Sequence, residues 1–188
     1  MMQRLFIYLS TIFATLMLGA CSQSAPPPKA APAATRPDVK DVKDVKMDAG
    51  AVAVVARIRA AGAQFDSSVE VKPLRDAAVE GLLKQAHDYE AQQQAGPALD
   101  AVAKALKIAP NAPDILQYQA ELQVEAGEWK LAAASAQRSY DLGPKVGALC
   151  ARNLQTLVET NNLLGDPTDA NLARQRLSSC KVPAPVHY

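Results

Sequence analysis

The apolar positions of the chain recur at helical spacing through most of residues 73–181, in runs that end at glycine or proline. Pro110 ends one alanine-rich run and Pro144 ends another 34 residues later, and Ala98 and Ala132 have the same separation. A fixed period of this length indicates an internal repeat whose unit is a single supersecondary motif. We therefore predict an all-α domain built of repeated helical hairpins.

Glycine and proline mark where these helices are expected to begin and end. Residues 96–97 and 143–144, both Gly-Pro, are typical helix stops, because proline cannot continue a helix that glycine has ended. Asn111 is an expected N-cap, and Asp114 places negative charge in the first turn that follows. One hairpin therefore ends at Pro110 and the next begins at once.

Residues 79–146 resemble two consecutive tetratricopeptide repeats, a family whose unit of 34 residues is one helical hairpin. The family keeps small residues where its two helices touch, a glycine in the turn and a proline after the second helix. The matching positions are Ala86, Tyr89, Ala98, Ala105, Leu106 and Pro110 in the first copy, and Ala120, Gly127, Trp129, Ala132, Ser139 and Pro144 in the second. The first copy departs from the pattern at Gln93, where the turn glycine is expected.

A third and looser unit follows the two clear copies. Its first helix runs to Leu164 and stops at Gly165, and Asp166 and Pro167 are the expected N-cap and first residue of its second helix. About three units are what a stack of hairpins needs for stability. The predicted fold class is therefore an all-α, tetratricopeptide-type helical-hairpin solenoid of about three units, preceded by a disordered tether and a short N-terminal helix.

Residues 1–20 have the features of a secretory signal peptide. Arg4 precedes an apolar run of 16 residues, which is shorter than the roughly 20 residues of a membrane-spanning helix; a permanent membrane helix is the alternative. Residues 18–21, Leu-Gly-Ala-Cys, resemble the lipobox of bacterial lipoproteins. The resemblance implies that Cys21 is acylated and becomes the first residue of the mature chain. Ser22, in place of an aspartate, favours the outer membrane, with the domain facing the periplasm.

The segment between this signal and the repeats divides into a spacer and a short helix. Residues 21–48 contain five prolines and three copies of Asp-Val-Lys, which are typical of a solvated spacer, with a charged binding motif as the alternative. Residues 49–63 predict a helix that caps the following helix, and the alternative places Arg57 and Arg59 on a membrane surface. The expected boundaries are a signal peptide at 1–20, a tether at 21–48, the short helix and an extended strap at 49–72, the helical domain at 73–181 and a tail at 182–188.

Composition and motifs exclude several function classes. Twenty Lys and Arg against 19 Asp and Glu give a net charge of +1, whereas nucleic-acid binders carry a basic excess. His87 and His187 stand in no metal-ligand spacing, and the sequence has no nucleophile, phosphate-loop or zinc-protease motif. We therefore expect no enzyme, metal, cofactor or nucleic acid, and we interpret His87 as a surface residue beside a groove.

Cys150 and Cys180 are the two cysteines that remain once Cys21 is assigned to the lipid. They lie at equal distances from the expected turn at Gly165, so an antiparallel hairpin would place them at the same level. An even pair in an exported protein predicts a disulfide. The alternative is two buried free thiols.

The family resemblance also implies a binding surface, because such repeats bind a peptide or helix along a concave face formed by their first helices. Carried over by position, that face comprises Glu80, Leu83, His87, Glu90, Asp114, Gln117, Glu121, Val124, Glu125, Ala151, Gln155 and Glu159. The face is mainly acidic, which predicts a partner segment with basic residues; the alternative is that these acids are only solvated helix surface. If the face is the binding site, reversing Glu121 and Glu125 to lysine should slow association with the partner far more than it disturbs folding.

Together these features predict a lipid-anchored adaptor or scaffold that mediates protein–protein interactions in the bacterial cell envelope. Proteins with this layout resemble assembly factors for outer-membrane, secretion, pilus or cell-wall complexes. The alternative function is a peptidoglycan-binding or ligand-binding envelope module, or an enzyme with an unrecognised site.

Overall fold

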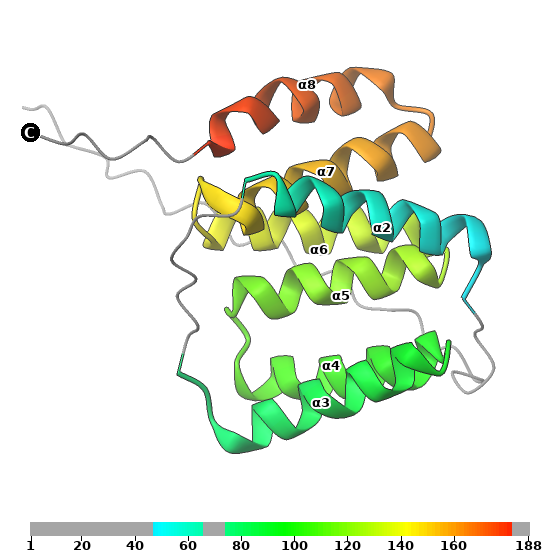
Figure 1. The fold of residues 1–188 in the computed structure, drawn as a ribbon, viewed down its shortest axis with the longest axis vertical. Helices are drawn as coiled ribbons and strands as arrows, with labels where there is room; N and C mark the ends of the chain where they lie inside the picture. The colour runs from blue at the N-terminus through cyan, green and yellow to red at the C-terminus, as the bar shows by residue number, and fades with distance from the viewer. Residues whose placement is uncertain (1–46, 66–73, 182–188) are drawn as a thin grey trace, which may run out of the picture. The chain divides into compact units, whose positions relative to one another are not determined.

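The computed structural model describes residues 47–65 and 74–181, and every regular element within them is a helix (Figure 1). The expected signal peptide, Cys21, most of the tether, the strap and the tail lie outside the described residues. The helices are α2 (Ala49–Ala63), α3 (Ala77–Ala91), α4 (Ala95–Ile108), α5 (Pro113–Glu125), α6 (Trp129–Leu142), α7 (Gly147–Leu163), α8 (Pro167–Leu177) and a short 3₁₀ helix, η2 (Ser178–Cys180).

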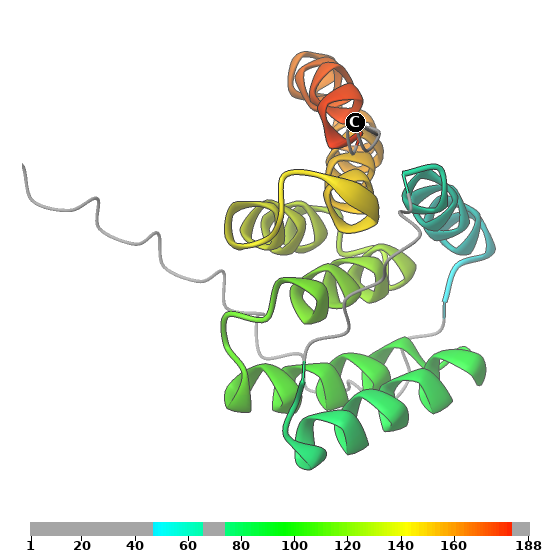
Figure 2. The ribbon, with the colours of Figure 1, turned by 60° about the vertical axis from the view of Figure 1, so that its left-hand side comes forward.

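Three antiparallel hairpins, α3–α4, α5–α6 and α7–α8, follow one another along the stack (Figures 1 and 2). The second helix of each of the first two hairpins also packs against the first helix of the next. Ala86, Ala98 and Ala105 are fully buried at these contacts, as are Ala120 and Ala132, because a methyl group lets two helix backbones approach closely. The all-α, helical-hairpin solenoid predicted from the sequence is confirmed.

The turns within the hairpins share one backbone conformation. Gly127 and Gly165 have positive φ angles of 73° and 77°, and Gln93 takes the same left-handed conformation with φ 60°. Only glycine adopts this conformation without a steric cost. The first hairpin therefore uses the expected turn position with a strained residue in place of glycine.

Two of the predicted helix boundaries are wrong, whereas α6 does stop at residues 143–144, where Gly143 is its C-cap. Asn111 is not the N-cap of α5; Ala112 takes that position, and the Asn111 side chain accepts a hydrogen bond from Arg138 instead. Residues 96–97 do not stop α3, which ends at Ala91; they lie in the first turn of α4, where proline is tolerated. Asp166 does cap α8, accepting a hydrogen bond from the backbone N–H of Asp169.

Helix α2 has the predicted bounds but not the predicted place. It was expected to cap α3, the next helix in the chain, and instead it packs against α7 and α5 (Figure 2). Val54, Val55 and Ile58 of α2 form one apolar cluster with Val124 and Ala132. Because these three side chains can be buried only against another apolar surface, their position decides where α2 lies.

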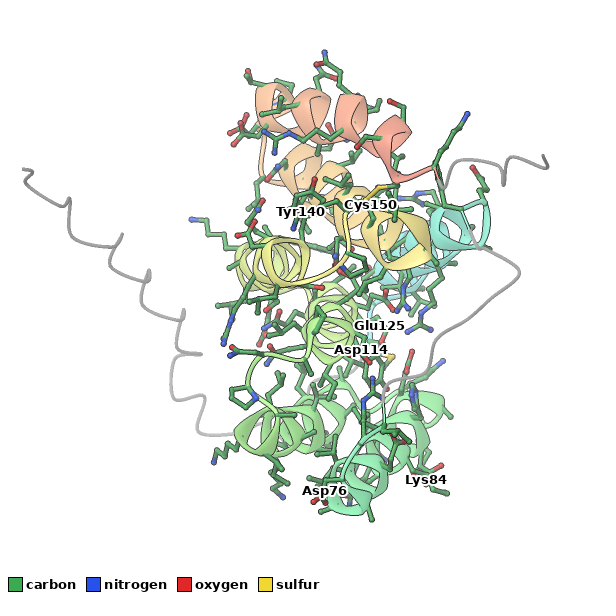
Figure 3. The ribbon with its side chains drawn as sticks, turned by 90° about the vertical axis from the view of Figure 1, so that its left-hand side faces the viewer. Asp76, Lys84, Asp114, Glu125, Tyr140 and Cys150 are labelled. Atoms are coloured by element: carbon green, nitrogen blue, oxygen red, sulfur yellow. A yellow bond between two sulfur atoms is a disulfide. The ribbon has the colours of Figure 1, made fainter. Side chains whose placement is uncertain are left out.

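A disulfide bond joins Cys150 of α7 to Cys180 of η2, with the two Cα atoms 5.6 Å apart. Both residues are fully buried, and Figure 3 shows the bond between the sulfur atoms beside Cys150. The bond closes the last hairpin at the end opposite its turn.

Candidate functional site

The first helices of the three hairpins, α3, α5 and α7, form a surface that we name the inner face. The sequence placed the binding residues on these helices, and α2 covers the part of the inner face over α5 and α7. The predicted residues therefore fall into a covered group and an open group.

Two arginines of α2 hold it on the acidic residues of the inner face. The Arg59 Nε donates to Glu121 Oε2 at 2.9 Å, and its Nη2 donates to Glu90 Oε1 at 2.7 Å. Arg57 binds Glu159 with both Nε and Nη2, at 3.0 and 2.9 Å. Burial lowers the pKa of Arg59, but the charges of Glu121 and Glu90 outweigh it and leave this pKa raised. Three of the acids expected to bind a basic partner, Glu90, Glu121 and Glu159, are thus paired with the chain's own arginines.

Glu121 lies at the centre of this arrangement, with none of its side chain exposed. Besides Arg59, it accepts hydrogen bonds from the Nε of Arg152, at 2.8 Å, and from Gln117, at 3.0 Å. A buried carboxylate is tolerated only when it is paired in this way. The prediction that Glu121 can be reversed as a surface residue is therefore wrong.

Glu125 is also buried, with only 3% of its surface exposed, and its Oε2 has no hydrogen-bond partner among the described residues. Burial raises its pKa to about 7, with Glu90 and Glu121 adding to the effect and Arg59 opposing it. Neither a free acidic groove nor a solvated helix surface describes this residue. Glu125 lies beside the start of α2, because the backbone N–H of Asp48, the N-cap of α2, donates to the Glu125 carbonyl.

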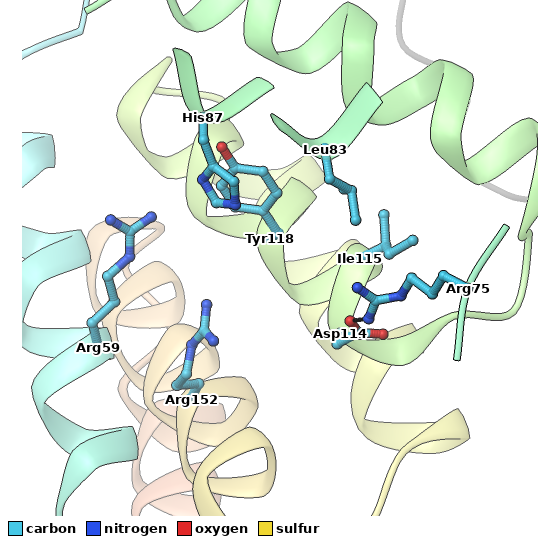
Figure 4. Close-up of a pocket in the computed structure, with 8 residues that line it drawn as sticks. All are labelled: Arg59, Arg75, Leu83, His87, Asp114, Ile115, Tyr118 and Arg152. Carbon is cyan, nitrogen blue, oxygen red and sulfur yellow. Dashed lines mark ion pairs between the residues drawn. The ribbon is translucent and has the colours of Figure 1, made fainter. Parts of the chain in front are cut away.

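The open part of the inner face contains a cavity of about 350 Å³. Figure 4 shows its lining, which comes from α2, from the segment before α3, and from α3, α5 and α7: Arg59, Arg75, Leu83, His87, Asp114, Ile115, Tyr118 and Arg152. Arg75 forms ion pairs with Asp114 and Glu80. Apolar side chains, aromatic rings and guanidinium groups thus meet in one concave site.

Two rings form one wall of this cavity. His87 and Tyr118 are stacked with their centroids 4.5 Å apart, and the Tyr118 hydroxyl donates to Glu90 Oε2 at 2.7 Å. Burial and the bond to Glu90 raise the pKa of Tyr118. Burial alone would raise the pKa of Glu90, but the bonds from Tyr118 and Arg59 lower it. Glu90 is therefore held in its ionised form next to Tyr118 and His87.

The twelve predicted residues are only partly brought together. Leu83, His87 and Asp114 line the cavity, Glu80 and Glu90 pair with arginines that line it, and Gln117 and Glu121 support it from beneath. Val124 packs against α2, Ala151 is buried in the core, and Gln155 donates to Glu159, which Arg57 binds.

Sequence reasoning missed five residues that line the cavity: Arg59, Arg75, Ile115, Tyr118 and Arg152. The excess of arginine in residues 49–63, opposite acidic first helices, is the signal that could have placed α2.

Two negative results concern the described residues only. Within residues 47–65 and 74–181, no group of three or more His, Cys, Asp or Glu side chains is placed to hold a metal ion. No helix in these same ranges is long and apolar enough to cross a membrane.

Comparison with known proteins gives two similarities and no matching family model. The chain is 34% identical over 82 residues, or 44% of its length, to cellulose synthase 1 operon protein C of Komagataeibacter xylinus, and this match spans 6% of that protein. The structure of the globular C-terminal domain of P. aeruginosa LpoP resembles this one with a TM-score of 0.51 and 25% sequence identity, over 56% of this chain and 99% of that domain. The described helices are therefore similar to a globular domain that occurs at the C-terminus of another bacterial protein.

Proposed function

We propose that this chain is a lipid-anchored helical-repeat adaptor of the bacterial cell envelope, which binds a segment of a protein partner on its inner face. The observation that carries the proposal is that the inner face already binds a helix, since α2 lies across α5 and α7 with apolar and ion-pair contacts. A surface that holds an amphipathic helix in this way uses a common mode of peptide recognition. The likeness to the LpoP domain supports the fold on which this mode depends.

The partner segment binds in the open part of the inner face, between α3 and α5. This part contains the cavity described above, and the side chain of His87 at its wall is 63% exposed. A partner that used the acids Glu121 and Glu159 would first have to displace α2. The basic partner segment predicted from the sequence would therefore compete with Arg57 and Arg59 for the carboxylates of Glu159 and Glu121.

The anchor of the proposed adaptor is Cys21, in the outer membrane, with the helical domain in the periplasm. The proposal rests on the apolar run and the Leu-Gly-Ala-Cys motif at residues 18–21, and several acyl chains are enough for stable attachment. Labelling cells with a clickable fatty acid tests it. Cys21→Ser should abolish incorporation, and a labelled Cys21→Ser protein would contradict the anchor.

Site-specific crosslinking in intact cells tests the adaptor function. A photoreactive amino acid at position 87, on the open part of the inner face, should capture one stoichiometric envelope protein. The matched control places it at Lys104, an exposed position on α4, and should capture none. Crosslinking to peptidoglycan, or equal capture of many proteins from both positions, would contradict the adaptor and support the cell-wall binding alternative.

A further inference from the structure

The cavity of the inner face brings together three arginines from three separate segments. Arg59 comes from α2, Arg75 from the segment before α3, and Arg152 from α7 (Figure 4). We propose that this cavity binds an aspartate or glutamate side chain of a partner segment, together with an apolar residue next to it. The inference rests on the proposed function and specifies the chemistry of the partner at that same site.

Glu121 holds two of these arginines in position from beneath. Its two carboxylate oxygens engage the Nε of Arg59 and the Nε and Nη2 of Arg152. A guanidinium has five N–H donors, and the Nη1 atoms of both residues have no hydrogen-bond partner among the described residues. The side chains are 42% and 30% exposed. Glu121 thus orients two guanidinium groups that line the cavity.

The carboxylates near the cavity are already used by these arginines. Glu121 is inaccessible, Glu90 is bound by Arg59 and Tyr118, and Asp114 is bound by Arg75. What the cavity offers to a new ligand is therefore an excess of hydrogen-bond donors. A lysine or arginine of a partner would meet three guanidinium groups, and like charges in contact are unfavourable. The site thus favours the opposite charge from the one that the acidic first helices suggest.

The rest of the lining fits an apolar neighbour of the acidic side chain. Leu83 and Ile115 supply aliphatic surface, and the stacked rings of His87 and Tyr118 supply a flat wall. A volume of about 350 Å³ is at the lower end of known ligand sites, which hold a small number of groups. An inorganic anion would leave this apolar surface unused, so the lining favours a peptide over free phosphate.

Fluorescence anisotropy with labelled peptides tests the proposal on the mature chain. The probe is a Gly-Ser peptide with Glu-Leu pairs, and the reference is the same peptide with Lys-Leu pairs. We expect the glutamate peptide to bind about tenfold more tightly or better, since each charge-assisted hydrogen bond supports a difference of that size. Equal binding of the two peptides would overturn the proposal.

Arg75→Gln is the variant of choice, because none of the ion pairs that hold α2 involve Arg75. It should weaken the glutamate peptide about tenfold and leave the melting temperature close to that of the parent. The matched control is Arg138→Gln, which removes an arginine bonded to Pro110 and Asn111 elsewhere on the surface and should not change binding. Undiminished binding by Arg75→Gln would overturn the proposal.

Inorganic phosphate is included as a competitor in the same assay. If millimolar phosphate binds while the glutamate peptide does not, the cavity takes a phosphate group, and the proposal of an acidic peptide is wrong. Such a result leaves the crosslinking test at position 87 unaffected, so failure of this inference is distinguishable from failure of the adaptor function.

Discussion

The inner face has two parts that carry similar acidic side chains and differ in what covers them. Over α5 and α7, Glu121 and Glu159 are bound by the arginines of α2. Between α3 and α5, the face stays open at a cavity into which arginine side chains project. Acidic residues along one face of a helix therefore do not by themselves indicate a free acidic surface. Complementary charge elsewhere in the same chain decides whether the face is available.

The largest expected effect comes from reversing the charge of Glu121, which pairs with Arg59 of α2 and with Arg152 of α7. Glu121→Lys would place a third cation beside Arg59 and Arg152 in a fully buried position. Breaking a buried ion pair costs about 3–5 kcal/mol, so we expect the melting temperature, followed by circular dichroism, to fall by about 10 °C or more.

The control for this variant is the same reversal at an exposed acid. Glu80→Lys removes a long contact of 3.5 Å to Arg75 and an acidic residue in the first turn of α3, and surface changes usually stay within about 0.5 kcal/mol. If both variants have the melting temperature of the parent, the buried ion pairs of Glu121 do not stabilise the fold as proposed.

The second prediction concerns the disulfide next to the covered part. Cys150 and Cys180 are separated by 30 residues, and closing a loop of that size contributes roughly 3–4 kcal/mol in the chain-entropy model. Reduction should therefore loosen α8 and η2 before the α3–α4 hairpin, because stacked repeats interact mainly with their neighbours. Hydrogen exchange with and without reductant measures this, and equal loss of protection in both hairpins would contradict it.

The third prediction concerns Glu125 and pH. Its pKa is raised from the usual 4.5 to about 7 in the folded protein, so folding binds its proton. The resulting stability is complete below pH 4.5 and is lost as the pH rises through 7, by about 1.4 kcal/mol for each pH unit in between. Glu125→Gln should remove this loss. We therefore expect the variant to gain free energy of unfolding relative to the parent between pH 5 and about 8; a constant difference across that range would exclude the effect.

The smallest expected effects come from a pair of glycines on the two parts. A Cβ at Gly62 of α2 would lie 2.6 Å from Arg152 Cγ and 3.3 Å from the Ala148 carbonyl, so Gly62→Ala should cost about 1 kcal/mol or more. Gly81 of α3 has no such neighbour within 4 Å among the described residues. Gly81→Ala should therefore stabilise the protein by about 0.5–1 kcal/mol. Urea unfolding checks the opposite signs, and equal signs would contradict the close contact of α2 with α7.

The repeats were predictable because their signals are local. Alanine at helix contacts, proline after the second helix and a fixed period describe one hairpin within a few tens of residues, and Asp166 marks the start of α8 through its own neighbours. Asn111 shows the limit of such reasoning. Its side chain is suited to an N-cap, but it accepts a hydrogen bond from Arg138, which lies 27 positions away.

The place of α2 was not predictable from its own pattern. Its bounds follow from its alanines and valines, but its position depends on pairs between residues separated by 31 to 102 positions. Arg57 and Arg59 therefore looked suited to a membrane surface as well as to a protein. The chemistry of the cavity was missed for the same reason, because Arg59, Arg75 and Arg152 meet only in three dimensions.

Hydrogen–deuterium exchange of the protein tests most directly whether α2 is bound to the inner face. We predict that the amides of α2 are protected to a degree similar to those of α5. In the double variant Arg57→Gln and Arg59→Gln, protection of α2 should fall while that of α4, which packs mainly against α3 and α5, stays unchanged. Exchange of α2 in the parent protein at the rate of an unstructured peptide would contradict the account, because the whole inner face would then be open and acidic.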